Sequence, residues 1–175
     1  MNLVKNFFFI LIILSLSTSF LKAQDKVSYI DIDYVLANTV VGKKLLNTLK
    51  KEEEIKINKF KLSDENFNNE ENKILSKKNL ISKEEINKEL KLLQVQYQNY
   101  RKEKIKDLDE FKKKRNRNIL NFLNLINPII EKYMTDNSIY MIIDKKNVFI
   151  ASKNYDITKN LIELIDDQIK TIEIK

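Results

Sequence analysis

The chain has 175 residues, of which 32 are basic and 25 acidic, with one glycine, one proline, no cysteine and no histidine. The missing residue types exclude disulfides, thiolate nucleophiles, zinc sites of the Cys/His type and histidine general bases. Glycine and proline lie far below their ordinary shares of about 7% and about 5%, so we expect few turns and long helices.

Residues 1–23 have the pattern of an export signal. Lys5 precedes an apolar run from Phe7 to Leu16, and Ala23 stands before a cleavage site ahead of Gln24. The run is shorter than the about 20 residues of a membrane span, although an uncleaved anchor is the alternative. No cysteine follows the run, which excludes a lipoprotein. The short export-type signal predicts a cleaved signal peptide and a protein of the bacterial periplasm.

A strand and a short helix are predicted next. Residues 26–33 alternate between two faces and are rich in β-branched and aromatic side chains, which predicts the strand. Asp33 stands where a helix cap would, ahead of a short helix over residues 34–37.

The first long helix is predicted over residues 40–78. Its apolar stripe is sparse, because Phe60, Phe67 and Ile74 recur only every seven residues. Such a stripe holds one partner helix at most and leaves much of the helix in water. At 1.5 Å per residue, a helix of about 38 residues reaches about 55 Å.

The second long helix begins after a turn at residues 79–82, because Ser82 and Glu85 have the spacing of a capping box. Its seam is fuller than that of the first helix, and we expect Pro128 to kink the helix rather than end it. The predicted seam residues are Ile86, Leu90, Leu93, Tyr97, Tyr100, Leu108, Phe111, Phe122, Ile126, Ile129 and Tyr133.

The last part of the chain is predicted to complete a small body. Residues 138–144 form a short apolar run typical of a buried strand, and residues 148–151 form a second strand after a turn, which gives a hairpin. Residues 159–168 form a final helix that packs on the sheet.

The predicted fold class is α+β, with a small β-rich body and a long antiparallel coiled-coil hairpin inserted after the first strand. In this organisation residues 1–23 are the signal peptide, residues 24–40 and 134–175 form the body, and residues 41–133 form the arm, with its tip near 79–82.

Five segments of this sequence resemble the Skp/OmpH family of periplasmic chaperones. Residues 27–36 are similar to that family's first strand and turn, and residues 41–45 to the start of its first arm. Residues 138–144, 148–151 and 156–158 are similar to its closing strands and final helix. Each motif alone is weak, but their order around a charged hairpin is specific, and the resemblance covers nearly the whole mature chain.

The resemblance implies a homotrimer in which the three bodies share a central β assembly for trimerisation. Three arms then surround a cavity that holds unfolded outer-membrane proteins without ATP, with no catalytic role and no cofactor or metal. One departure is Asn137-Ser138, where the family commonly has a glycine.

The positive charge is concentrated in the second helix. Residues 101–117 contain nine basic and four acidic side chains, whereas residues 118–175 contain seven and eight. We therefore expect a cationic surface that holds acidic unfolded chains weakly at many points, although solvated helix faces are the simpler interpretation. The candidate basic residues are Arg101, Lys102, Lys104, Lys106, Lys112, Lys113, Lys114, Arg115 and Arg117.

Apolar side chains of the arm are a second set of candidate client contacts. The spacing of the aromatic ones favours the core of the hairpin, whereas Leu80 and Ile81 lie at its predicted tip, where they either staple the helix entry or form an exposed apolar patch. The candidate apolar residues are Phe60, Phe67, Leu80, Ile81, Tyr97 and Tyr100. The carboxylates Asp31, Asp33 and Asp144 lie near apolar strands, but caps and strand-end turns explain them better than acid–base catalysis does.

Two functions remain open at this point. The first is a holdase for unfolded envelope proteins. Such a holdase could also bind lipopolysaccharide or an anionic membrane surface as a second partner. The alternative is a structural or adaptor coiled coil of the cell envelope that binds one folded partner. Nucleic acid is not expected, because the chain carries an export signal.

Overall fold

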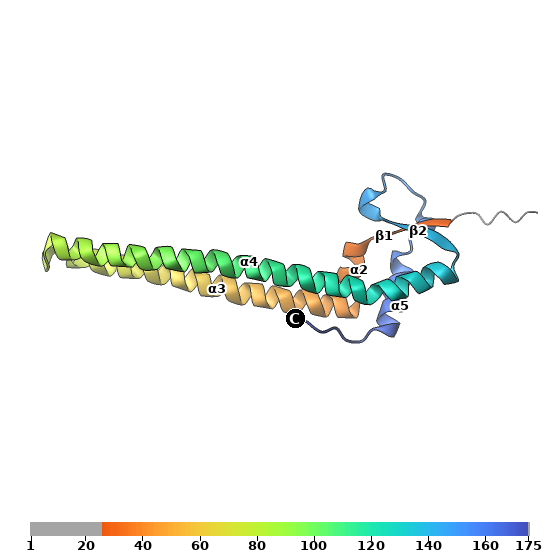
Figure 1. The fold of residues 1–175 in the computed structure, drawn as a ribbon, viewed down its shortest axis with the longest axis horizontal. Helices are drawn as coiled ribbons and strands as arrows, with labels where there is room; N and C mark the ends of the chain where they lie inside the picture. The colour runs from red at the N-terminus through yellow and green to blue at the C-terminus, as the bar shows by residue number, and fades with distance from the viewer. Residues whose placement is uncertain (1–25, 175) are drawn as a thin grey trace, which may run out of the picture.

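The computed structural model describes residues 26–174 and shows a long helical hairpin that projects from a small body (Figure 1). The arm consists of helix α3 (Val40–Ser76) and helix α4 (Lys83–Asp136), joined through the short 3-10 helix η1 (Lys77–Asn79). The predicted fold class is confirmed, because this antiparallel hairpin comes after the first strand of the described residues and projects from a small body with a two-stranded sheet. Within residues 26–174, no helix is both long and apolar enough to cross a bilayer.

The body contains two strands and two short helices. Strand β1 (Lys26–Ile30) leads into helix α2 (Ile32–Asn38), and strand β2 (Ile139–Asp144) is followed, after 3-10 turns η2 (Lys145–Asn147) and η3 (Lys153–Tyr155), by helix α5 (Thr158–Gln168). β1 and β2 pair in parallel. A parallel pair needs a long crossover connection, and here the whole arm provides it. The outer edge of β1 is bridged at Tyr29, so β2 has the open edge of the described sheet.

The end of the first strand differs from the prediction. β1 stops at Ile30, and Asp31 rather than Asp33 caps α2: the Asp31 Oδ1 accepts a hydrogen bond of 2.9 Å from the Tyr34 amide. The Asp31 amide donates to the Thr158 hydroxyl at 2.9 Å, so contact with α5 takes it out of the strand. Asp33 is exposed in the first turn of α2.

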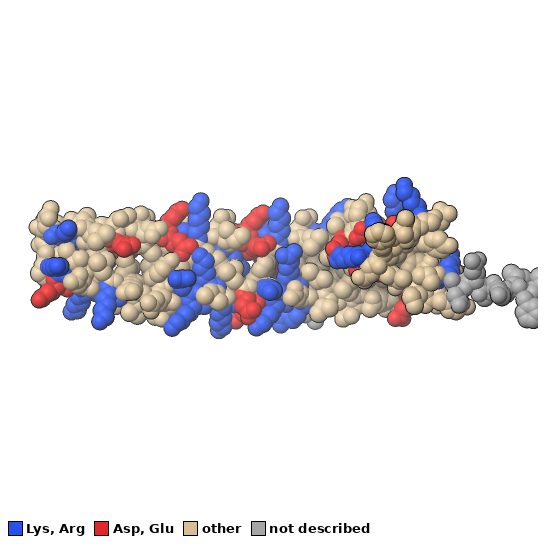
Figure 2. Space-filling model, turned by 90° about the horizontal axis from the view of Figure 1, so that it is seen from above, with Lys and Arg blue, Asp and Glu red and all other residues tan. Residues whose placement is uncertain are grey.

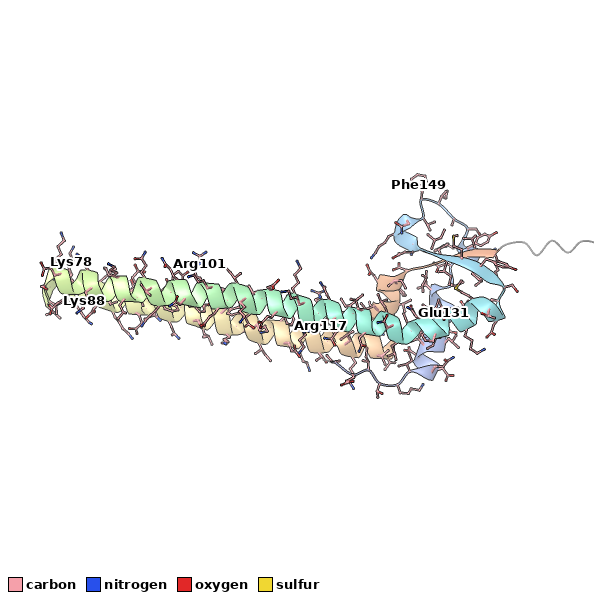
Figure 3. All side chains as sticks on the ribbon, viewed as in Figure 1. Lys78, Lys88, Arg101, Arg117, Glu131 and Phe149 are labelled. Atoms are coloured by element: carbon pink, nitrogen blue, oxygen red, sulfur yellow. The ribbon has the colours of Figure 1, made fainter. Side chains whose placement is uncertain are left out.

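The predicted hairpin between residues 138–144 and 148–151 is wrong. Residues 148–151 form no strand, and the side chains of Phe149 and Ile150 are fully and 85% exposed. The η2 turn, in which the Asp144 carboxylate accepts from the Lys146 amide at 3.0 Å, directs the chain away from β2. In Figure 3, Phe149 lies at the outer end of this loop, far from the arm.

Gly42 and Ser138 mark the two points where the backbone restricts the side chain. A Cβ atom on Gly42 would lie 2.0 Å from the Leu36 carbonyl oxygen, so only glycine permits the close turn between α2 and α3. Ser138 has a φ of 53°, a left-handed conformation that favours glycine. The family that the sequence resembles commonly has a glycine here, and this chain has a serine in a backbone conformation that favours glycine.

One apolar cluster joins the base of the arm to the body. It combines side chains of β1, α2, α3, α4, β2 and α5 with Ile172 from the segment after α5. Figure 1 shows this last segment running beside the base of the hairpin. α4 continues through Pro128, as predicted. Figure 1 shows this helix changing direction between the arm and the body.

Candidate functional site

The seam between the two arm helices is apolar near the body and charged in the middle. At the base, Leu45, Leu49 and Phe122 are almost completely buried. Farther out, three ion pairs cross the seam, and the 4-3 spacing of α4 places their residues at positions where a coiled coil usually has apolar side chains. The pairs are Glu52–Lys114, Lys56–Asp107 and Asp64–Lys104.

Lys104 is the centre of the middle section. Its ammonium group lies 2.8 Å from the Asp64 carboxylate and stands over the rings of Phe60 and Tyr100, at 5.3 Å and 5.7 Å from their centroids. The hydrogen bond from Lys104 lowers the pKa of Asp64, and the same bond raises the pKa of Lys104. Burial raises the pKa of Tyr100, whose hydroxyl donates to the Phe60 carbonyl at 3.0 Å.

The nine predicted basic residues therefore divide into three groups. Lys104 and Lys114 are committed to the seam, at 2.8 Å from Asp64 and Glu52. Lys106 and Lys113 pair along α4 with acidic residues one turn away. The remaining five are exposed and make no ion pair with another residue of the described range 26–174: Arg101, Lys102, Lys112, Arg115 and Arg117.

The predicted apolar client contacts also divide into seam residues and exposed residues. Phe60 is buried, and Phe67 and Tyr100 are half-buried, their ring centroids 5.2 Å apart, so these three side chains belong chiefly to the seam. Tyr97 stacks edge-on against Phe67 at 5.2 Å but is 38% exposed. At the tip Leu80 is 82% exposed, whereas Ile81 is half-buried.

Leu108 is not in the seam, where the sequence analysis placed it. Asp107 occupies that position, and Leu108 and Ile105 are instead exposed on the side of α4. Carrying the 4-3 spacing through charged residues, from Tyr100 to Lys104 and Asp107, would have identified both exposed side chains from the sequence.

A shallow pocket of about 390 Å³ opens between the helices in the outer half of the arm, a feature that the sequence analysis missed. Rings of Phe67 and Tyr97 and two leucines provide its apolar wall, and two amides and one carboxylate provide its polar edge. Its lining residues are Phe67, Asn68, Glu71, Leu90, Leu93, Gln94 and Tyr97.

Charged side chains lie along the whole length of the arm. Figure 2 shows lysine and arginine side chains along the arm on the face it presents, with fewer acidic ones between them. Within residues 26–174, no three acidic residues gather in a way that could hold a metal ion. The candidate site is the long, mainly basic surface of the arm.

The fold and this surface define a class of proteins in which a charged helical hairpin projects from a small α/β body. A sequence model described as outer membrane protein (OmpH-like) matches residues 26–165, and the chain belongs to this family. No curated protein matches the sequence.

The structure is similar to the crystal structure of an OmpH-like protein from Caulobacter crescentus, which is provisionally described as an outer membrane chaperone. The TM-score is 0.73 at 18% sequence identity, and the match covers 84% of this chain and 87% of that one. At this identity the similarity shows the fold.

Proposed function

We propose that this protein is an ATP-independent holdase of the periplasm, which keeps unfolded outer-membrane proteins soluble between the arms of a homotrimer. The observation that carries the proposal is the set of unpaired cations on the arm. Arg101, Lys112 and Arg115 project from α4 with the exposed apolar side chains of Ile105 and Leu108 among them. Many weak contacts of both kinds hold an unfolded chain and release it without a chemical fuel.

The surface of the body supports assembly into a trimer. β2 has an open edge, and the exposed apolar side chains of Tyr140, Met141, Phe149 and Ile150 lie on it or on the loop that follows. An open edge is a template for pairing with another chain, and exposed apolar patches mark interaction sites. A neighbouring copy that pairs with residues 148–151 would give that segment the strand partner it lacks within one chain.

The proposed location is the periplasm, reached through the export signal in residues 1–23, which lies outside the described residues. The family membership supports this proposal. Holding a client requires no catalytic group, cofactor or metal, and none is included in the proposed function.

The experiment measures light scattering while an acidic outer-membrane barrel protein is diluted out of urea, with and without the protein from residue 24 onward. We expect suppression of aggregation at about 0.1 M salt and weaker suppression at about 1 M, because the Debye length falls from about 10 Å to about 3 Å. The mass of the protein in solution should be that of three chains.

A matched control is the same barrel protein already folded in detergent, which should not bind. The proposal is wrong if the protein is monomeric and the barrel protein aggregates equally fast in its presence. Binding of one folded envelope protein instead would favour the adaptor alternative, and binding to anionic vesicles alone would favour a membrane surface as the partner.

A further inference from the structure

One side of α4 carries a continuous row of residues that connects the pocket to the unpaired cations. Successive members are three or four positions apart, so they lie above one another on the helix. The row consists of Leu90, Gln94, Tyr97, Arg101, Ile105, Leu108, Lys112 and Arg115. Its first three members line the pocket between the arm helices.

The pocket end of the row suits an aromatic ring with a polar edge. Phe67 and Tyr97 offer ring faces, while Asn68, Gln94 and Glu71 offer hydrogen-bonding groups at the rim. A tyrosine or tryptophan side chain has the matching combination of an apolar body and a polar tip. The Glu71 carboxylate can accept a hydrogen bond from either of them.

The rest of the row offers cations and apolar surface but no acidic side chain. Ile105 is 65% and Leu108 44% exposed, and the three cations Arg101, Lys112 and Arg115 are exposed around them. On the other side of α4, Lys106 and Lys113 are neutralised by Glu110 and Asp109, so cations there alternate with acids.

The length of the row matches one strand of a membrane barrel. Gln94 and Arg115 are 21 positions apart, about 31 Å along a helix. An extended chain covers that distance in about nine or ten residues, and a transmembrane β-strand has about 9–11. Such strands alternate apolar and polar residues and carry aromatic residues at their ends.

We propose that this row binds one unfolded barrel strand along α4, with a terminal tyrosine or tryptophan in the pocket and acidic residues of the strand on Arg101, Lys112 and Arg115. The inference rests on the proposed holdase function and adds to it a defined side of the arm and a defined client segment. Acidic residues on alternate positions would lie on one face of the extended segment, toward the cations, and the row's apolar members would contact the segment between them.

The test measures fluorescence anisotropy of a labelled ten-residue peptide that has a terminal tyrosine and alternating apolar and aspartate residues. The row variant is Arg101→Gln, Lys112→Gln and Arg115→Gln in the protein from residue 24 onward. The control variant is Lys102→Gln, Lys106→Gln and Arg117→Gln, which removes the same charge from positions of α4 outside the row. Figure 3 labels Arg101, which belongs to the row, and Arg117, which belongs to the control set.

We expect the row variant to bind the peptide about tenfold more weakly than the wild type, and the control variant less than about threefold. A peptide with serine in place of tyrosine should also bind the wild type about tenfold more weakly. Both variants change exposed side chains only, and circular dichroism should show equal helix content.

Equal losses in the two variants overturn the inference, because charge alone would then hold the peptide on any side of the arm. Equal binding of the tyrosine and serine peptides likewise overturns the role of the pocket. In both cases the holdase function stands if the wild type still prevents aggregation of the unfolded barrel protein. If the wild type does not prevent this aggregation, the proposed function itself is wrong.

Discussion

The base and the middle of the arm are built in different ways. At the base, Leu45, Phe122 and Ile126 are fully buried in a cluster that also contains α2, α5 and the segment after α5. In the middle, Phe60 is buried outside that cluster, and charged pairs such as Asp64–Lys104 cross the seam around it.

Because of this difference, the base of the arm sets its direction, whereas the middle determines how easily the arm bends. Burial at the base sets the direction in which the hairpin leaves the body, because displacement there would expose the whole cluster. The crossing ion pairs in the middle are about one-third exposed, and exposed pairs contribute only about 0–1 kcal/mol each. The middle of the arm can therefore bend or separate at a much lower free-energy cost than the base.

The largest expected effect comes from truncating the base. Phe122→Ala should lower the free energy of unfolding by about 3–5 kcal/mol, because a completely buried ring is lost from the shared cluster. Phe60→Ala, the matched change in the middle of the arm, should cost clearly less, about 2 kcal/mol, since the arm can close around the gap. Urea unfolding followed by circular dichroism measures both, and equal losses would contradict the comparison.

A smaller effect, an increase in stability, is expected when a charged pair in the middle of the arm is replaced by apolar residues like those at the base. The double change Asp64→Leu with Lys104→Leu should raise the free energy of unfolding by about 1–2 kcal/mol and make it less dependent on salt. Each single variant should be less stable than the double variant, because the remaining charged partner then lies unpaired in the seam. A double variant less stable than the wild type would show that the ion pair itself holds the middle.

The smallest expected effect is a pH dependence of the same pair. Because the hydrogen bond from Lys104 lowers the pKa of Asp64 in the folded state, this carboxylate contributes stability above its ordinary pKa of 3.8. That contribution is lost as the pH falls through the lower folded-state pKa. The difference in thermal midpoint between wild type and Asp64→Asn should therefore be present at neutral pH and shrink on acidification; a difference that stays constant would contradict the assignment.

The arm was predictable from sequence because its signals are local. Ser82 and Glu85 form the expected capping box, with hydrogen bonds of 3.2 Å and 3.1 Å between side chains and amides. The missing part of the prediction was the charged seam. A seam defined by apolar residues alone passes over Lys104 and Asp107, although the 4-3 spacing includes both positions.

The body was harder to predict because its contacts join distant parts of the chain. Asp31 leaves the strand through a bond to Thr158, 127 residues later, which no local pattern contains. Residues 148–151 have the composition of a strand, but a strand also needs a partner, and the described chain offers none. The pocket was missed for the same reason, since its wall combines residues of both helices.

The segment after α5 has a consequence for how the molecule assembles. Ile172 is buried in the cluster at the base, and the Asn121 amide group donates to the Glu173 carbonyl at 3.3 Å. The anchor of the arm is thus completed by residues that leave the ribosome after both arm helices. Until residues 172 and 173 have been synthesised, the base of the hairpin lacks these contacts. Docking of this segment would therefore be a late step of folding.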